Sequence, residues 1–295
     1  PFVLYVNFIE PHMPFFGPRD NQYDPAVLPL PPNFEALPGE QQPLKTRAMV
    51  EAFREQGCTV PLRTDDDWRR LIANYWGLCS LVDTHVGTIL DTLEACGLSD
   101  NTIVVFTSDH GDMMGSHRLV AKCVMYQESV RVPLMIRLPA QTKGQRVMGP
   151  VSQVDVVPTL LELMGQPQPD HLQGTSLCNL ISEEQADRKR NVVIEWNGPD
   201  GIGLFTRGLP SALQGKVSPE ELEASLTDPV RTIITPDGWK FNCSPRGDHE
   251  LYNLNSDPGE ATNIFADNKE LALKLREEIV AWQQETGDTV ELPVL

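Results

Sequence analysis

Residues 102–111 read TIVVFTSDHG, a run of β-branched and aromatic residues that ends in an aspartate, a histidine and a glycine. The run predicts a strand buried on both faces, because it is continuously apolar rather than alternating. In an open parallel sheet, ligands bind beyond the carboxyl ends of the strands, which is where Asp109 and His110 fall. Gly111 leaves room for close approach of the backbone. The stretch therefore predicts both a sheet and a site at its edge.

The elements on either side of this stretch predict an α/β fold. FVLYVNF at residues 2–8 has the pattern of another buried strand. Three aspartates at 65–67 begin a helical pattern that ends near Gly97. Strand, long helix and strand in this order are typical of a βαβ unit, so we expect a mainly parallel sheet flanked by helices. A third strand is expected at 132–139 and a glycine-closed helix at 155–165.

The C-terminal third of the chain has a different texture. Short β-rich runs separated by turn residues, followed by a helical pattern, predict a small antiparallel sheet with a packed helix. The expected strands cover 192–196, 229–235, 239–243 and 250–254, and the helix covers about 268–286. We therefore expect an α/β catalytic part over 1–190 and an α+β subdomain over 191–295. The proline-rich residues 9–42 predict a long loop, and 198–225 predict a surface excursion.

The composition excludes several classes of partner. The chain carries 24 Lys and Arg against 41 Asp and Glu, a formal net charge of −17. Such a surface repels nucleic acid and anionic membranes, so neither is expected as a partner. An anionic substrate would need a local positive site, which makes a lysine or histidine in a cleft informative. The six cysteines contain no C-x-x-C pair, so neither a zinc ribbon nor a thioredoxin-type site is indicated.

Two strand ends place ionisable side chains at one edge of the expected sheet. The strand at 102–107 is followed by Asp109 and His110, and the run at 2–8 is followed by Glu10-Pro11-His12. A carboxylate and an imidazole side by side make half of a plausible divalent metal site. We expect Asp109, His110, His12 and Lys122 to meet in one pocket.

The resemblance to a family rests on several motifs in order. Residues 107–139, TSDHGDMMGSHRLVAKCVMYQESVRVPLMIRLP, resemble the second signature region of the sulfatases, in the alkaline phosphatase superfamily. The helix and strand before it, SQVDVVPTLLELMG after it, and ELYNLNSDPGEATNI near the C-terminus also resemble that family. The resemblance extends from Phe2 to about Trp282, and it implies an alkaline phosphatase-like fold.

The resemblance implies a role for each matching residue. Asp109 and His110 fall where two metal ligands lie, and Lys122 falls where a lysine contacts the sulfate group. His12 matches a histidine that contacts the sulfate and protonates the departing alcohol. His117 lies in the same segment and is expected to bind substrate. The metal is calcium by resemblance, while magnesium and manganese stay open because calcium prefers oxygen ligands.

One departure from the family concerns the nucleophile. Family members carry a C-x-P-S-R or S-x-P-S-R motif, whose Cys or Ser is oxidised to formylglycine, after a strand with two more acidic ligands. No such motif occurs in these 295 residues. Cys243-Ser244-Pro245-Arg246 lacks the second serine, so we predict a turn between strands with a structural Cys243. The chain thus resembles the C-terminal two-thirds of a sulfatase, and formylglycine is expected upstream of it.

The sequence therefore predicts a sulfuric ester hydrolase that acts on a small-molecule or saccharide sulfate ester, with this chain inactive by itself. One alternative is a phosphonate monoester or phosphodiester hydrolase of the same superfamily, because phosphoryl and sulfuryl groups have similar size and geometry. A second alternative is a non-catalytic protein that keeps the fold for binding.

Overall fold

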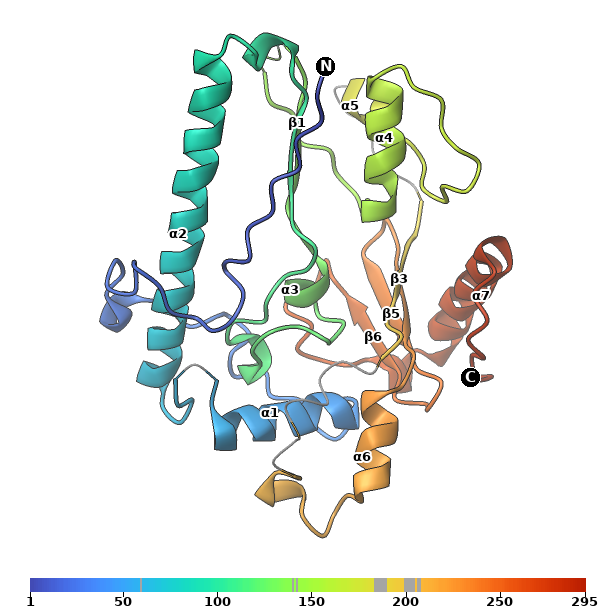
Figure 1. Cartoon of the computed structure of the whole chain (residues 1–295). Helices are drawn as coiled ribbons and strands as arrows, with labels where there is room; N and C mark the ends of the chain where they lie inside the picture. The colour runs from blue at the N-terminus through green and yellow to red at the C-terminus, as the bar shows by residue number, and fades with distance from the viewer. Residues whose placement is uncertain (59, 140, 142, 183–189, 199–204, 206–207) are drawn as a thin grey trace. The chain divides into compact units, whose positions relative to one another are not determined.

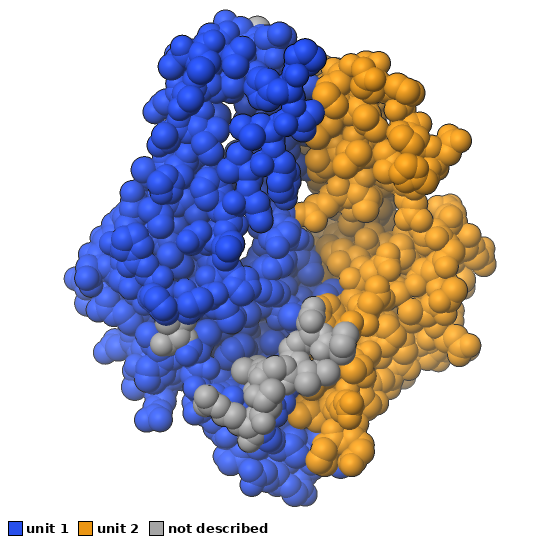
Figure 2. Space-filling view, in the orientation of Figure 1, with its two compact units in different colours: residues 1–38, 46–142, 203–218 blue, residues 39–45, 143–202, 219–295 orange. Residues whose placement is uncertain are grey.

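The structure is a computed structural model that describes residues 1–58, 60–139, 141, 143–182, 190–198, 205 and 208–295. The chain forms two compact units, coloured separately in Figure 2. Unit 1 comprises residues 1–38, 46–142 and 203–218, and unit 2 comprises 39–45, 143–202 and 219–295.

The helices and strands are drawn in Figure 1. The helices are α1 (Leu44–Gln56), α2 (Asp65–Ala95), α3 (Gln127–Val130), α4 (Val156–Leu163), α5 (Cys178–Ser182), α6 (Pro219–Leu226) and α7 (Lys269–Thr286). The strands are β1 (Val104–Thr107), β2 (Leu134–Arg137), β3 (Val192–Glu195), β4 (Arg231–Ile234), β5 (Trp239–Cys243) and β6 (Glu250–Asn253). None of the helices in the described part of the chain is long and apolar enough to cross a membrane.

Helix α2 forms as the sequence predicts and supports the loop before it. Thr64 is the N-cap, and its side chain and that of Asp67 form a capping box. The first half of α2 is buried against the long loop at 9–42. Asn74 donates to the carbonyl of Phe15 (2.9 Å), and the ring of Trp68 meets that of Phe34 edge-on. The proline-rich loop is therefore held on a rigid helix.

Two of the three strands predicted in unit 1 form, but they pair differently from the expectation. β1 and β2 make a two-stranded antiparallel sheet in which Val105 pairs with Ile136 and Thr107 with Leu134. The described residues contain no parallel pair. The predicted parallel βαβ unit is therefore absent from the described strands, because the order of strands along the chain does not fix which strand edges form hydrogen bonds.

The predicted buried strand at 2–8 is wrong for this structure. These residues form no strand and are largely exposed: Val3 is 90% exposed and Tyr5 is 86% exposed. Phe8 stacks on His85 of α2 with ring centroids 6.5 Å apart. A strand needs a neighbour that pairs with its backbone, and the described residues provide none here.

Unit 2 contains the expected antiparallel sheet and helix. β3, β4, β5 and β6 lie in this order, each antiparallel to its neighbour. One face packs on α7 through a core of Ile233, Phe241, Leu251, Leu275 and Ile279. This sheet and helix confirm the predicted C-terminal α+β architecture.

The expected surface excursion at 198–225 lies only partly within the described residues. Residues 199–204 and 206–207 lie outside the described residues, and α6 begins at Pro219. Leu222 and Leu226 of α6 are 5% and 3% exposed, so this end of the segment is a packed helix. The compact units divide the chain at other positions than residue 190. The division into a catalytic part and a subdomain at 190 stays a prediction.

Candidate active site

Asp109 and His110 follow the end of β1 and lie beside each other. His110 Nε2 is 3.5 Å from Asp109 Oδ2, and the His110 backbone N–H donates to Asp109 Oδ1 (3.0 Å). His110 Nδ1 lies 2.8 Å from the Gly111 carbonyl. A carbonyl only accepts, so Nδ1 carries a proton and Nε2 is the ring nitrogen that faces the carboxylate. In its neutral form, the ring has the tautomer that a metal-binding histidine needs.

Electrostatics keep Asp109 ionised. Burial pushes the pKa of Asp109 upward, but the hydrogen bond from the His110 backbone N–H and the charge of His110 outweigh it, and the net pKa is lowered. The side chain is 83% exposed, so a cation can reach it. The carboxylate is in the form that binds a cation.

The fit to a divalent metal is partial. Within the described residues, no group of three or more His, Cys, Asp or Glu side chains could hold a metal ion. Asp109 and His110 provide one oxygen and one nitrogen donor, whereas hard cations take about six or more ligands. The pair suits a metal chemically, but it does not complete a site.

Gly111 is required for the packing of this dipeptide. Its N–H donates to the carbonyl of Ser129 (2.8 Å). A Cβ on Gly111 would lie 1.9 Å from the carbonyl oxygen of Glu128, a distance that no side chain tolerates. The loop after β1 is therefore fixed against α3 by backbone contact.

His12 and Lys122 meet, while the predicted convergence of this pair with Asp109 and His110 in one pocket stays a prediction. Lys122 Nζ lies 2.7 Å from His12 Nε2, although the residues are 110 positions apart. His12 Nδ1 lies 2.7 Å from the carbonyl of Met13, so Nδ1 donates and Nε2 accepts from the lysine. The two side chains therefore form a polar pair that small anions can approach, because His12 is exposed.

His117 occupies a different environment. Its side chain is buried, its ring stacks on Tyr126 at 4.0 Å, and its Nδ1 lies 2.7 Å from the Ala36 carbonyl. Its Nε2 accepts from the amide of Asn33 (3.3 Å), which also donates to Glu128 (2.8 Å). These contacts join the loop at 33–36 to the segment that carries Lys122. The predicted contact between His117 and substrate stays a prediction, and the ring hydrogen bonds described here favour a structural role.

Sequence reasoning missed Asp112. Its Oδ1 accepts from the backbone N–H groups of Met114 (3.1 Å) and Ala121 (3.0 Å). The sequence feature that could have identified Asp112 is an acidic residue two positions after His110, in a segment that contains glycine and serine.

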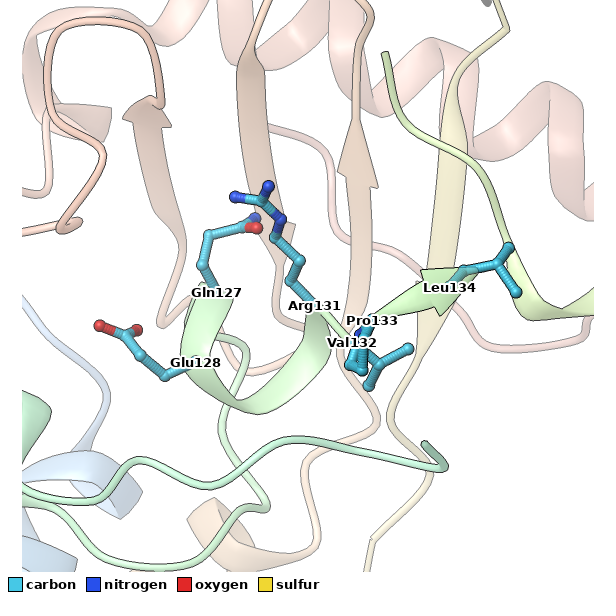
Figure 3. Close-up of a pocket in the computed structure, with 6 residues that line it drawn as sticks. All are labelled: Gln127, Glu128, Arg131, Val132, Pro133 and Leu134. Carbon is cyan, nitrogen blue, oxygen red and sulfur yellow. The ribbon is translucent and has the colours of Figure 1, made fainter. Parts of the chain in front are cut away.

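A hollow of about 500 Å³ lies along the segment just after Lys122. Gln127, Glu128, Arg131, Val132, Pro133 and Leu134 line it. In Figure 3 the side chains of Gln127 and Arg131 lie next to each other, while that of Glu128 points elsewhere. Its lining contains none of the predicted site residues.

Cys243 is a core residue of unit 2. It is fully buried in the same apolar cluster as Phe241 and Ile279. Burial raises the pKa of its thiol to about 12, so the thiol stays protonated at neutral pH. This environment supports the prediction that Cys243 is structural.

Comparison with known proteins places the chain among sulfatases. A family model described as Sulfatase matches residues 1–166, more than half of the chain. Arylsulfatase K of Xenopus laevis is 31% identical over 277 residues, which cover 90% of this chain and 48% of the relative. The chain thus spans about half the length of the curated relatives it matches.

Solved structures with a similar fold include phosphonate hydrolases as well as sulfatases. The phosphonate monoester hydrolase of Agrobacterium radiobacter superposes with a TM-score of 0.70 at 26% identity, covering 95% of this chain and 56% of that one. A protein solved with its substrate D-glucosamine-2-N,6-O-disulfate superposes with a TM-score of 0.58 at 28% identity, covering 75% and 41%. These neighbours confirm the alkaline phosphatase-like α/β fold class. The chain belongs to the sulfatase family.

Proposed function

We propose that this chain is part of a hydrolase that cleaves sulfate esters, and that His12 and Lys122 are the residues that contact the substrate. The observation that carries the proposal is the 2.7 Å contact between His12 Nε2 and Lys122 Nζ in a sulfatase-family chain. In a protein with a net charge of −17, two nitrogen side chains from distant segments form a local site for an anion.

Each residue of the pair has one role in this proposal. A sulfate oxygen takes the place of His12 Nε2 as the acceptor for the Lys122 ammonium. Once the sulfate oxygen has displaced Nε2 from Lys122, His12 takes up a proton from solvent at Nε2 while its Nδ1 stays bonded to the Met13 carbonyl, and it gives the Nε2 proton to the departing alcohol. Lys122 also offsets the negative charge that develops on the sulfuryl oxygens.

Asp109 and His110 would supply two ligands of a divalent metal, calcium by resemblance. When bound, the metal would neutralise charge on the sulfuryl group. The covalent nucleophile is expected to be a formylglycine outside these 295 residues, because the sequence contains no C-x-P-S-R or S-x-P-S-R motif. We therefore propose that this chain by itself does not turn over aryl sulfates.

The proposed substrate class is a small-molecule or saccharide sulfate ester. The relative solved with a disulfated glucosamine supports a saccharide. The second candidate is a phosphonate monoester, favoured by the 0.70 TM-score of the Agrobacterium hydrolase.

Anion binding tests the proposal on the chain itself. Calorimetric titration with inorganic sulfate should give weak binding, and Lys122→Gln should weaken it by about tenfold, the worth of one charge-assisted hydrogen bond. His12→Ala should also weaken sulfate binding. Lys216→Gln, which alters an exposed lysine of unit 1, is the matched control and should leave the affinity unchanged.

The same titration separates the candidates. Methylphosphonate binding at least as tight as sulfate, with the same dependence on Lys122, would favour the phosphonate hydrolase. Sulfate binding that is indifferent to both His12→Ala and Lys122→Gln would contradict the site assignment.

A further inference from the structure

The segment that carries Lys122 has an unusual backbone. Met114, His117, Arg118, Ala121 and Cys123 all have positive φ angles, between 37° and 79°. Residues with a Cβ disfavour this region, so such a segment persists only when its surroundings hold it. Lys122 lies between two of these residues, Ala121 and Cys123. The position of its side chain therefore depends on what fixes the adjacent backbone.

Asp112 closes this segment into a loop. Its Oδ1 accepts from the N–H of Met114 at 3.1 Å and, nine residues along the chain, from the N–H of Ala121 at 3.0 Å. The N–H of Met113 donates to the carbonyl of Ala121 at 2.7 Å, next to the same junction. The two ends of the loop are thus joined immediately before Lys122.

Asp112 also lies within the electrostatic reach of the candidate site. Burial raises the pKa of its carboxyl group, while the charges of Lys122 and His110 act in the opposite direction. The carboxyl group therefore has one predicted metal ligand and the predicted sulfate-binding lysine as electrostatic neighbours.

We propose that Asp112 is a positioning residue that holds Lys122 opposite His12 through its two backbone hydrogen bonds. The expected effect of Asp112 on sulfate binding rests on the proposed function. The effect of Asp112 on the position of Lys122 does not, and it can be tested separately. The side chain of Asp112 acts through Ala121 and need not touch the substrate.

Lysine labelling tests the placement directly. The chain is treated with an amine-reactive reagent, and mass spectrometry gives the rate at Lys122 relative to the exposed Lys216. In Asp112→Ala, Lys122 should leave His12 and react about tenfold faster, the effect of losing one or two hydrogen bonds to a carboxylate. Asp112→Asn keeps an oxygen acceptor at the same place and should restore the slow rate.

Asp67→Ala is the matched control. Asp67 Oδ2 also accepts from two backbone N–H groups of unit 1, those of Arg63 (3.0 Å) and Thr64 (2.9 Å). Its loss should leave labelling of Lys122 unchanged. Unchanged labelling in Asp112→Ala, or fast labelling in Asp112→Asn, would overturn the inference.

Hydrogen exchange of the unaltered chain keeps the inference testable if Asp112→Ala fails to fold. The amides of Met114 and Ala121 should exchange at least about tenfold more slowly than unbonded amides. If these two amides exchange as fast as amides without a hydrogen bond, the proposed hydrogen bonds to Asp112 are refuted.

Sulfate titration separates this inference from the proposed function. If the labelling rate of Lys122 changes in the Asp112 variants as expected but the chain has no affinity for sulfate, the positioning role of Asp112 stands and the sulfate-binding site is rejected. Sulfate binding that weakens in parallel with faster labelling supports both.

Discussion

At the scale of single residues, the candidate site depends on close backbone contacts. Gly111 follows the Asp109–His110 pair and donates to Ser129 at the end of α3. The sequence indicated that a glycine permits close approach there, but it did not identify the partner. The structure identifies it as the Glu128 carbonyl.

We predict that Gly111→Ala destabilises the chain by about 2 kcal/mol or more, because the methyl group would overlap a carbonyl oxygen that cannot rotate away. Urea unfolding measures the change. Gly87→Ala is the control, since Gly87 lies within α2 and a Cβ there meets no atom within 4 Å. Alanine at 87 should stabilise the helix by roughly 0.5–1 kcal/mol. Equal stability of the 111 variant and the parent would contradict the close packing of this loop.

At the scale of elements, the turn between β5 and β6 contains a histidine that is buried uncharged. His249 Nδ1 accepts from the N–H of Ser244 (3.2 Å), and its ring lies 4.8 Å from that of Phe265. Burial, with a smaller contribution from the charge of Arg276, lowers the pKa of His249 to about 4. The sequence placed a turn here, but only the tertiary packing shows that His249 is buried and that its pKa is lowered.

We predict that unit 2 loses stability as the pH falls from about 6.5 to about 4. In this window the unfolded chain binds a proton at His249 and the folded chain does not, so the free energy of unfolding falls with pH, by at most roughly 3 kcal/mol. His249→Asn keeps an acceptor near Nδ1 and cannot titrate, so it should flatten this part of the curve. Thermal unfolding at several pH values measures the slope.

His171→Asn is the matched control for this experiment, because His171 is an exposed histidine of unit 2. Its substitution should leave the pH dependence as in the parent chain. A slope that His249→Asn does not change would show that other groups cause the acid sensitivity.

At the scale of the whole molecule, the exposed run at 2–8 is the largest departure from the sequence prediction. Val3, Leu4 and Tyr5 are 90%, 68% and 86% exposed. An apolar run with β-forming residues and unpaired backbone groups favours pairing with another chain. We expect the 295-residue chain to self-associate through this run.

Sedimentation velocity of the double variant Val3→Lys, Tyr5→Lys tests this expectation. Two charges on alternate residues should shift the chain toward the monomer, because like charges oppose edge-to-edge pairing. Val27→Lys, at another residue of unit 1 that is 76% exposed, is the control and should leave the distribution unchanged. A monomeric parent chain would contradict the expectation outright.

The sequence by itself determined the features that depend on neighbouring residues and on motif order. The acidic start of α2, the short strands near the C-terminus, the segment with Asp109, His110 and Lys122, and the family membership were all readable. Tertiary structure decided which strands pair, that residues 2–8 form no strand, that His117 is buried and that Asp112 joins the ends of its loop. The physical reason is the separation along the chain of the residues that interact. Caps and periodicity act within a few residues, whereas pairing and burial depend on contacts between residues a hundred or more positions apart, such as His12 and Lys122, which are 110 positions apart.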